Sequence, residues 1–72
     1  MVILEFNIHS ELDNKTLNKT ETLPTKEAAL ARAQGYQNTY HGNFTFIRIR
    51  DKQTDQTLVD QRQFNNIEPP IT

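Results

Sequence analysis

The chain has 72 residues, with eight basic and nine acidic side chains, two histidines and no cysteine. A chain this short holds one hydrophobic core and no second domain, and two histidines cannot complete a structural zinc site. The nearly balanced charge gives no long-range field that would gather nucleic acid or an anionic membrane. No apolar run approaches the roughly 20 residues that span a bilayer, and a basic region before an apolar core is missing at the N-terminus. We therefore expect a cytoplasmic protein without a membrane partner.

The first third of the chain predicts two strands joined by a turn. Apolar and polar residues alternate from 2 to 10, which is typical of a half-buried strand. The turn formers Asp13 and Asn14 follow, and the threonine-rich segment 16–22 predicts a second, polar strand. Lys15 and Lys19 suit a sheet edge, where charged side chains discourage pairing with another chain.

A helix is predicted from 26 to 40. Thr25 can cap the first free backbone amides, and Glu27 lies in the first turn, where the helix dipole favours a negative charge. Gly42 is placed to adopt the left-handed conformation that ends the helix. Gly35 inside the helix costs about 1 kcal/mol relative to alanine. Apolar side chains three and four residues apart form one stripe, Ala29, Leu30, Ala33, Tyr36 and Tyr40.

The second half of the chain predicts a hairpin with strands at 44–51 and 57–64. Its loop places Asp55 in the left-handed position, which aspartate tolerates. Residues 65–72 contain two adjacent prolines and are expected to form a flexible tail. The sequence thus predicts a single α+β domain over 1–64 in the order β-β-α-β-β. Antiparallel hairpins form its sheet, and the helix packs on one face of that sheet.

Counting outward from the hairpin loop pairs Arg48 with Asp60 and Ile49 with Val59. Strict alternation then places the β-branched residues Ile47, Ile49 and Val59 under the helix. Because one helix covers one side of a sheet, large side chains on the other side meet solvent unless a partner binds them. The candidate binding residues on that second face are Phe44, Phe46, Arg48, Arg50, Leu58, Arg62 and Phe64.

Phenylalanine and arginine are enriched at the centres of protein interfaces, so this face indicates protein binding. We expect a small non-catalytic regulator, adaptor or inhibitor that acts on its own, for example a phage- or plasmid-encoded inhibitor of a host or defence complex. Homodimerisation through the same face is one alternative, and single-stranded nucleic acid stacking on Phe44 and Phe46 is another. Ordinary cross-strand pairs on a solvated sheet also explain the pattern. In that case the C-terminal tail or the edge strand from Lys15 to Glu21 is the next candidate.

No other group of residues predicts a cofactor, a metal or an enzyme. His9, Glu11 and Asp13 alternate as in a metal triad, but the sequence fixes no fourth ligand and Asp13 suits a turn. The aspartates of the last hairpin lack the glycine and glutamate of a calcium loop. Ser10 follows His9, but adjacent strand residues point to opposite faces, so the pair does not form a nucleophile and base.

Overall fold

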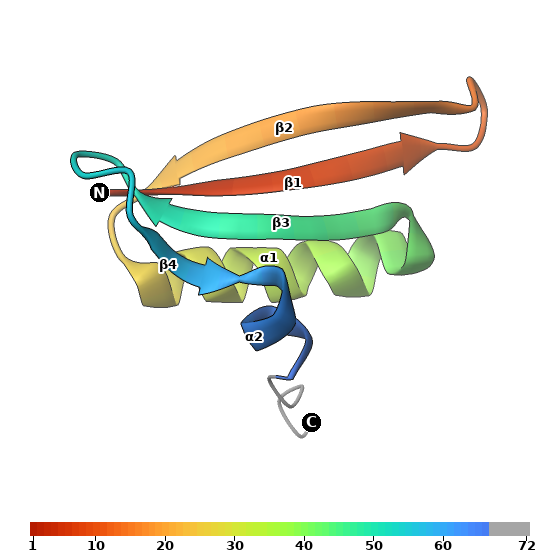
Figure 1. The fold of residues 1–72 in the computed structure, drawn as a ribbon. Coiled ribbons are helices and arrows are strands. Elements are labelled where there is room, and N and C mark those ends of the chain that lie inside the picture. The colour runs from red at the N-terminus through yellow and green to blue at the C-terminus, as the bar shows by residue number, and fades with distance from the viewer. Residues whose placement is uncertain (67–72) are drawn as a thin grey trace.

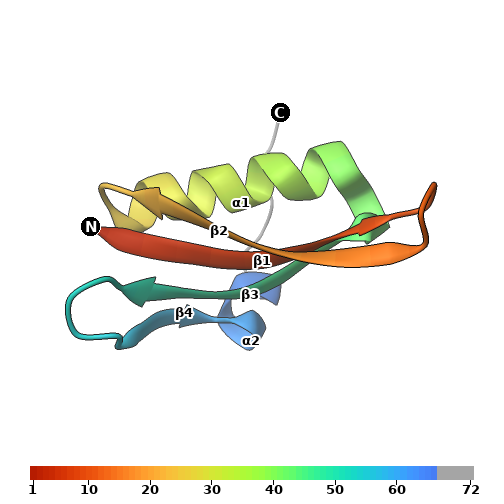
Figure 2. The same cartoon turned by 90° about the horizontal axis from the view of Figure 1, so that it is seen from above.

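The computed structural model of the protein describes residues 1–66 and contains one antiparallel sheet with a helix along one face (Figures 1 and 2). The strands lie in the order β2-β1-β3-β4. This arrangement confirms the predicted α+β class with one main helix. In chain order the elements are β1 (Val2–Ser10), β2 (Lys15–Leu23), α1 (Lys26–Tyr40), the 3-10 turn η1 (His41–Asn43), β3 (Phe44–Asp51), β4 (Thr57–Asp60) and α2 (Gln61–Asn65).

The β1–β2 hairpin is regular along its whole length. Its register runs from Val2 opposite Leu23 to Ser10 opposite Lys15 without a shift. Asn14 turns the chain with a φ of 53°, a left-handed conformation that asparagine adopts more readily than most residues. The two strands therefore pair along their whole length, and β2 is an edge strand of the sheet (Figure 1).

The helix α1 begins and ends within the predicted residues. The Oγ1 atom of Thr25 accepts a hydrogen bond of 3.1 Å from the backbone N–H of Ala28, as expected for the cap. The prediction that Gly42 supplies a left-handed turn is wrong, because the residue with positive φ at the helix end is His41, with φ 54° and ψ −125°. The backbone N–H of His41 donates to the carbonyl of Gln37, so the helix closes one residue early and Gly42 lies in η1.

A β-bulge in β3 overturns the predicted faces of residues 44–47, whereas Ile49 faces the helix and Arg48 and Arg50 face away from it, as predicted. Glu5 of β1 lies opposite Arg48 and the next residue, Phe6, lies opposite Phe46, so Ile47 is an extra residue. An extra residue reverses the alternation of the side chains that follow it. Phe46 before the bulge and Ile49 after it consequently face the helix together, whereas Ile47, predicted as core, is 37% exposed.

The last predicted strand is half as long as expected. The pairs of Arg48 with Asp60 and Ile49 with Val59 are confirmed, but Arg50 lies opposite Thr57 because Leu58 is bulged. The chain then leaves the sheet, since Asp60 caps α2. Its Oδ1 atom accepts from the backbone N–H of Gln63 at 2.7 Å, and Gln63 Oε1 accepts from the backbone N–H of Asp60 at 2.9 Å.

Residues predicted as strand at 61–64 therefore form α2, which also includes Asn65 of the predicted tail. Residues 67–72 of that tail lie outside the described residues. The short helix brings Phe64 into the core, where its ring stacks on Phe46 with centroids 4.2 Å apart. The buried core of the described chain comprises Val2, Leu4, Phe6, Ala29, Ala33, Phe44, Phe46, Ile49, Val59 and Phe64.

The bulge predicts very different effects for two neighbouring residues. Phe46 is 3% exposed and Ile47 is 37% exposed. We expect Phe46→Ala to lower the free energy of unfolding by about 3–5 kcal/mol and Ile47→Ala by about 1 kcal/mol or less. Urea denaturation of both variants measures the difference. Equal losses would contradict the assignment of these two side chains to opposite faces.

Candidate functional site

The seven predicted binding residues do not form one surface. Phe44, Phe46 and Phe64 are buried in the core, so their assignment to an exposed face is wrong. The bulge at Ile47 turns the first two toward the helix, and α2 carries the third there. Leu58 is half-buried and packs against the same core. The aromatic part of the predicted interface is therefore part of the hydrophobic interior.

The predicted arginines lie on the surface, and two of them are paired with carboxylates. Glu5 Oε1 accepts from Arg48 Nε at 3.0 Å and from Arg50 Nε at 2.5 Å. Asp55 Oδ1 accepts from a terminal nitrogen of Arg50 at 2.9 Å. Hydrogen bonding to Glu5 raises the pKa of Arg50 above its ordinary value. Two arginines thus face two carboxylates with no excess charge, while Arg62 lies separately, exposed on α2.

Apart from Ile3 and Ile47, most of the remaining face of the sheet away from α1 consists of small polar side chains. Cross-strand pairing places threonine and asparagine from three strands beside one another on it. None of the aromatic side chains of residues 1–66 belongs to this face, so it offers no platform on which bases could stack. Its small polar members are Thr16, Asn18, Thr20 and Thr22 of β2, Asn7 of β1 and Thr45 of β3.

Two of the three residues that alternate like a metal triad in the sequence, His9 and Glu11, have other contacts in the structure. His9 Nδ1 lies 3.1 Å from Thr16 Oγ1, and Glu11 Oε1 accepts a long hydrogen bond of 3.4 Å from Asn43. Asp13 lies exposed in the turn between β1 and β2. Within residues 1–66, no three His, Cys, Asp or Glu side chains are grouped so that they could hold a metal ion.

The aspartates of the final hairpin hold its backbone. Asp51 Oδ1 accepts from the backbone N–H groups of Gln53 at 2.8 Å and Thr54 at 3.0 Å. These hydrogen bonds lower the pKa of the Asp51 carboxyl. Asp55 has a φ of 62°, as predicted for the left-handed position of the loop. The carboxylates therefore have defined structural partners at the loop.

The longer of the two edge strands of the sheet is β2. Its nine residues pair with β1 on one side, and no other described segment pairs with its outer side. Seven of the nine are exposed and two are half-buried. An extended strand with free backbone donors and acceptors on one side is a template on which another strand can form hydrogen bonds.

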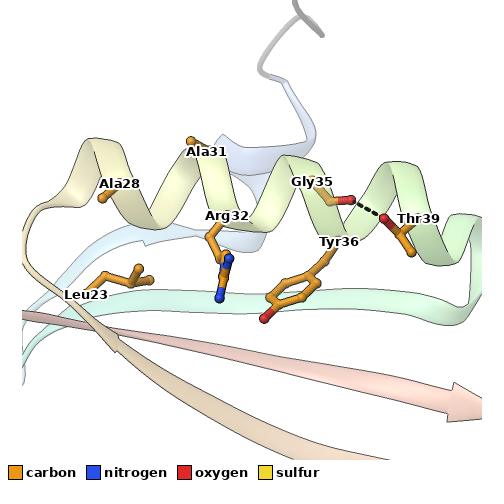
Figure 3. A pocket seen from close by; sticks show the side chains of 7 residues that line it. All are labelled: Leu23, Ala28, Ala31, Arg32, Gly35, Tyr36 and Thr39. Carbon is orange, nitrogen blue, oxygen red and sulfur yellow. Dashed lines mark hydrogen bonds between the residues drawn. The ribbon is translucent and has the colours of Figure 1, made fainter.

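A groove of about 610 Å³ runs beside this edge, between β2 and α1 (Figure 3). Arg32 and Tyr36 extend from the helix toward the strand, and Leu23 lies at one end. Small side chains leave the helix side of the groove open. The groove is lined by Leu23, Ala28, Ala31, Arg32, Gly35, Tyr36 and Thr39.

Glu21 connects the strand to the helix at this groove. Its carboxylate accepts hydrogen bonds from Arg32 Nε at 2.7 Å and from the Tyr36 hydroxyl at 2.8 Å. Partial burial raises the pKa of Glu21, but the hydrogen bonds from Arg32 and Tyr36 outweigh it, so the pKa lies below its ordinary value. The hydrogen bond that the Tyr36 hydroxyl donates to Glu21 raises the pKa of Tyr36. A carboxylate has about four acceptor positions, so Glu21 keeps room for a further donor.

Gly35 is not required by the packing of the chain. A Cβ atom added there would meet nothing within 4 Å, and its φ is not positive. The helix therefore carries the propensity cost of glycine of about 1 kcal/mol without a contact inside the described structure that needs it. The consequence of the glycine is a flatter helix wall at the groove.

The sequence indicates the edge strand but not the groove. Lys15, Lys19 and the threonines mark β2 as a polar edge, as expected. Arg32 and Gly35 were missed as site residues, because their role depends on where α1 lies over the sheet. The available signal is the row of small residues on the exposed side of the helix.

No protein-family model, curated protein or solved structure matches this chain. Across residues 1–66, no helix combines the length and apolar character that crossing a membrane requires.

The depressed pKa of Glu21 gives a pH-dependent contribution to stability. A carboxyl whose folded-state pKa is lowered stabilises the fold above its unfolded pKa of about 4.5, and this contribution is lost as the pH falls through the folded-state value. We expect Glu21→Gln to lower the unfolding free energy by about 0.5–1 kcal/mol at pH 7 and by almost nothing near pH 2. Urea titrations across this range measure it, with Glu11→Gln as the control. A constant difference at all pH values would contradict the assignment.

Proposed function

We propose that this chain is a small non-catalytic protein-binding domain, a regulator, adaptor or inhibitor, that binds an extended segment of a partner along β2. The observation that carries the proposal is the long, regular and exposed edge of that strand. Main-chain hydrogen bonds along such an edge supply affinity, and alternate side chains of the added strand supply specificity.

The two edge strands of the sheet, β2 and β4, differ in their capacity for strand addition. β4 has four residues, contains a bulge at Leu58 and continues directly into α2. Bulges and short strands interrupt the row of backbone groups that a new strand needs. β2 has nine residues and pairs with β1 without a shift in register. Strand addition is therefore favoured at β2.

The groove defines the chemistry of the partner on the helix side. Apolar side chains of the added strand would pack on Leu23 and the small residues of α1. A basic side chain would meet the Glu21 carboxylate, which already accepts from Arg32. On the other side, the row of threonine and asparagine suits small polar side chains. The partner strand thus alternates small polar residues with apolar or basic ones.

Binding in place of catalysis is supported by the contacts of Glu5, Glu21 and His9. Glu5 pairs with arginines on the open face, and Glu21 pairs with Arg32 and Tyr36. His9 contacts a threonine hydroxyl between β1 and β2. These groups stabilise the sheet surface where they stand, and catalysis is not part of the proposal.

Selection from a library of displayed random decapeptides tests this function directly. Bound peptides are expected to shift the backbone amide resonances of Lys15–Leu23 in NMR spectra, because hydrogen bonds form along this edge. Shifts confined to the β3–β4 hairpin or to the arginine face would contradict strand addition at β2. The peptides themselves are expected to alternate small polar with apolar or basic residues.

A variant in the groove separates binding from folding. Gly35→Gln adds a side chain where a Cβ has no neighbour, so the unfolding free energy should rise by about 0.5–1 kcal/mol. The same side chain occupies the groove, and we expect the dissociation constant of selected peptides to rise about tenfold, which corresponds to about 1.4 kcal/mol. Isothermal titration measures it, with Asn38→Gln on the exposed helix surface as the matched control. Unchanged affinity for Gly35→Gln would exclude the groove from the binding site.

A further inference from the structure

We infer that a second copy of this chain occupies the β2 edge, in a symmetric dimer whose two-fold axis passes beside Thr20. The inference rests on the proposed function, because it names the partner of the same edge. In the dimer two β2 strands run antiparallel and join the two sheets into one. Its support is the pattern of charge and apolar residues along β2, which is complementary to itself.

Symmetry limits the possible pairings. A two-fold axis perpendicular to the sheet keeps each face on its own side, so opposite residues must differ by an even number. With the axis at Thr20, Lys19 lies opposite Glu21 of the second copy, and Leu17 lies opposite its Leu23. Each of these contacts occurs twice. On the open face Thr20 meets itself, and Asn18 meets Thr22.

Neighbouring registers match less well. An axis at Lys19 or at Glu21 places like charges directly opposite each other, which is destabilising. An axis at Leu17 pairs Lys15 with Lys19 of the second copy. An axis at Asn18 pairs Lys15 with Glu21 but sets each Leu17 against Lys19. The register at Thr20 combines opposite charges with a leucine pair.

The positions of Leu17 and Lys19 in the monomer support the same register. Leu17 is 50% exposed, although leucine is usually buried. Opposite it in the dimer would lie Leu23, which is half-buried at the end of the groove. Leu17 of each copy therefore enters the groove of the other. Lys19 would reach the Glu21 carboxylate from the side not taken by Arg32 and Tyr36.

The size of the contact indicates moderate affinity. Residues 17–23 would pair, and Pro24 has no backbone N–H with which to extend the ladder. Interfaces of this size are smaller than the standard stable class and bind in the weak or transient range. We therefore expect a dissociation constant on the order of 1–100 μM.

Charge reversal tests the pairing of Lys19 with Glu21. Lys19→Glu sets two acidic residues of one strand against two of the other, and we expect the dimer dissociation constant to rise at least tenfold. Sedimentation velocity from about 1 μM to about 1 mM measures the constant. Lys52→Glu in the β3–β4 loop changes the net charge equally and should leave it unaltered. Equal effects of the two variants would overturn the ion pair.

Single cysteines test the register, because the chain contains no cysteine of its own. A bismaleimide with a reach of about 8 Å should join two Thr20→Cys chains, whose Cβ atoms lie about 5 Å apart. Asn18→Cys alone should not cross-link, since its two copies are about 14 Å apart along the strand. A mixture of Asn18→Cys with Thr22→Cys should cross-link as a heterodimer. Efficient cross-linking of Asn18→Cys alone would overturn the register.

The outcomes distinguish this inference from the proposed function. A chain that stays monomeric up to about 1 mM overturns the dimer. If decapeptides still bind along β2 of that monomer, strand addition to a different protein stands. If a dimer forms without protecting the β2 amides from hydrogen exchange, the dimer at this edge is overturned, and peptide binding along β2 decides the proposed function separately.

Discussion

The extra residue at Ile47 determines which side chains form the core. It places Phe46 and Ile49, three positions apart, on the same face of β3, where strict alternation would separate them. Phe46 can then stack on Phe64 beneath the helices. The bulge also turns Arg48 and Arg50 to the opposite face, beside Glu5. One irregularity thus separates an aromatic core from a neutral network of ion pairs.

The bulges also make the two edges of the sheet differ in regularity. β3 and β4 each contain one, and the chain leaves the sheet at Asp60 to form α2. α1 packs mainly against β3 and β1 and less against β2, which leaves the helix-facing side of β2 partly uncovered. The β1–β2 hairpin has no bulge and stays regular to its end. Accessible backbone, half-buried leucine and the Glu21 carboxylate consequently gather at β2.

Periodicity was sufficient to predict β1, β3, α1 and the sheet class, because each depends on residues close in sequence. Counting outward from the loop also predicted the pairs of Arg48 with Asp60 and Ile49 with Val59, whereas the pairs nearer the loop are shifted because Leu58 is bulged. The faces of the β3 side chains before the bulge were not predictable, because the bulged residue is an isoleucine and no glycine marks its position in the sequence. The capping box of Asp60 and Gln63 is a readable signal for α2 that the strand pattern of 57–64 obscured. The groove depends on the placement of α1, which no local pattern specifies.

Lys19 disfavours pairing of the β2 edge with an arbitrary strand, but it favours pairing with a strand that places a carboxylate opposite it. A lysine on an edge strand disfavours casual pairing, because an unmatched ammonium group beside the groove would lose water without gaining a partner. Opposite a carboxylate the same group contributes to binding. Glu21 supplies that carboxylate two residues away on the same face of the strand, already oriented by Arg32 and Tyr36. A shift of one residue exchanges the faces, and a shift of two brings like charges together. In the proposed dimer, the edge therefore accepts a strand in one register while resisting the continuous pairing that leads to aggregation.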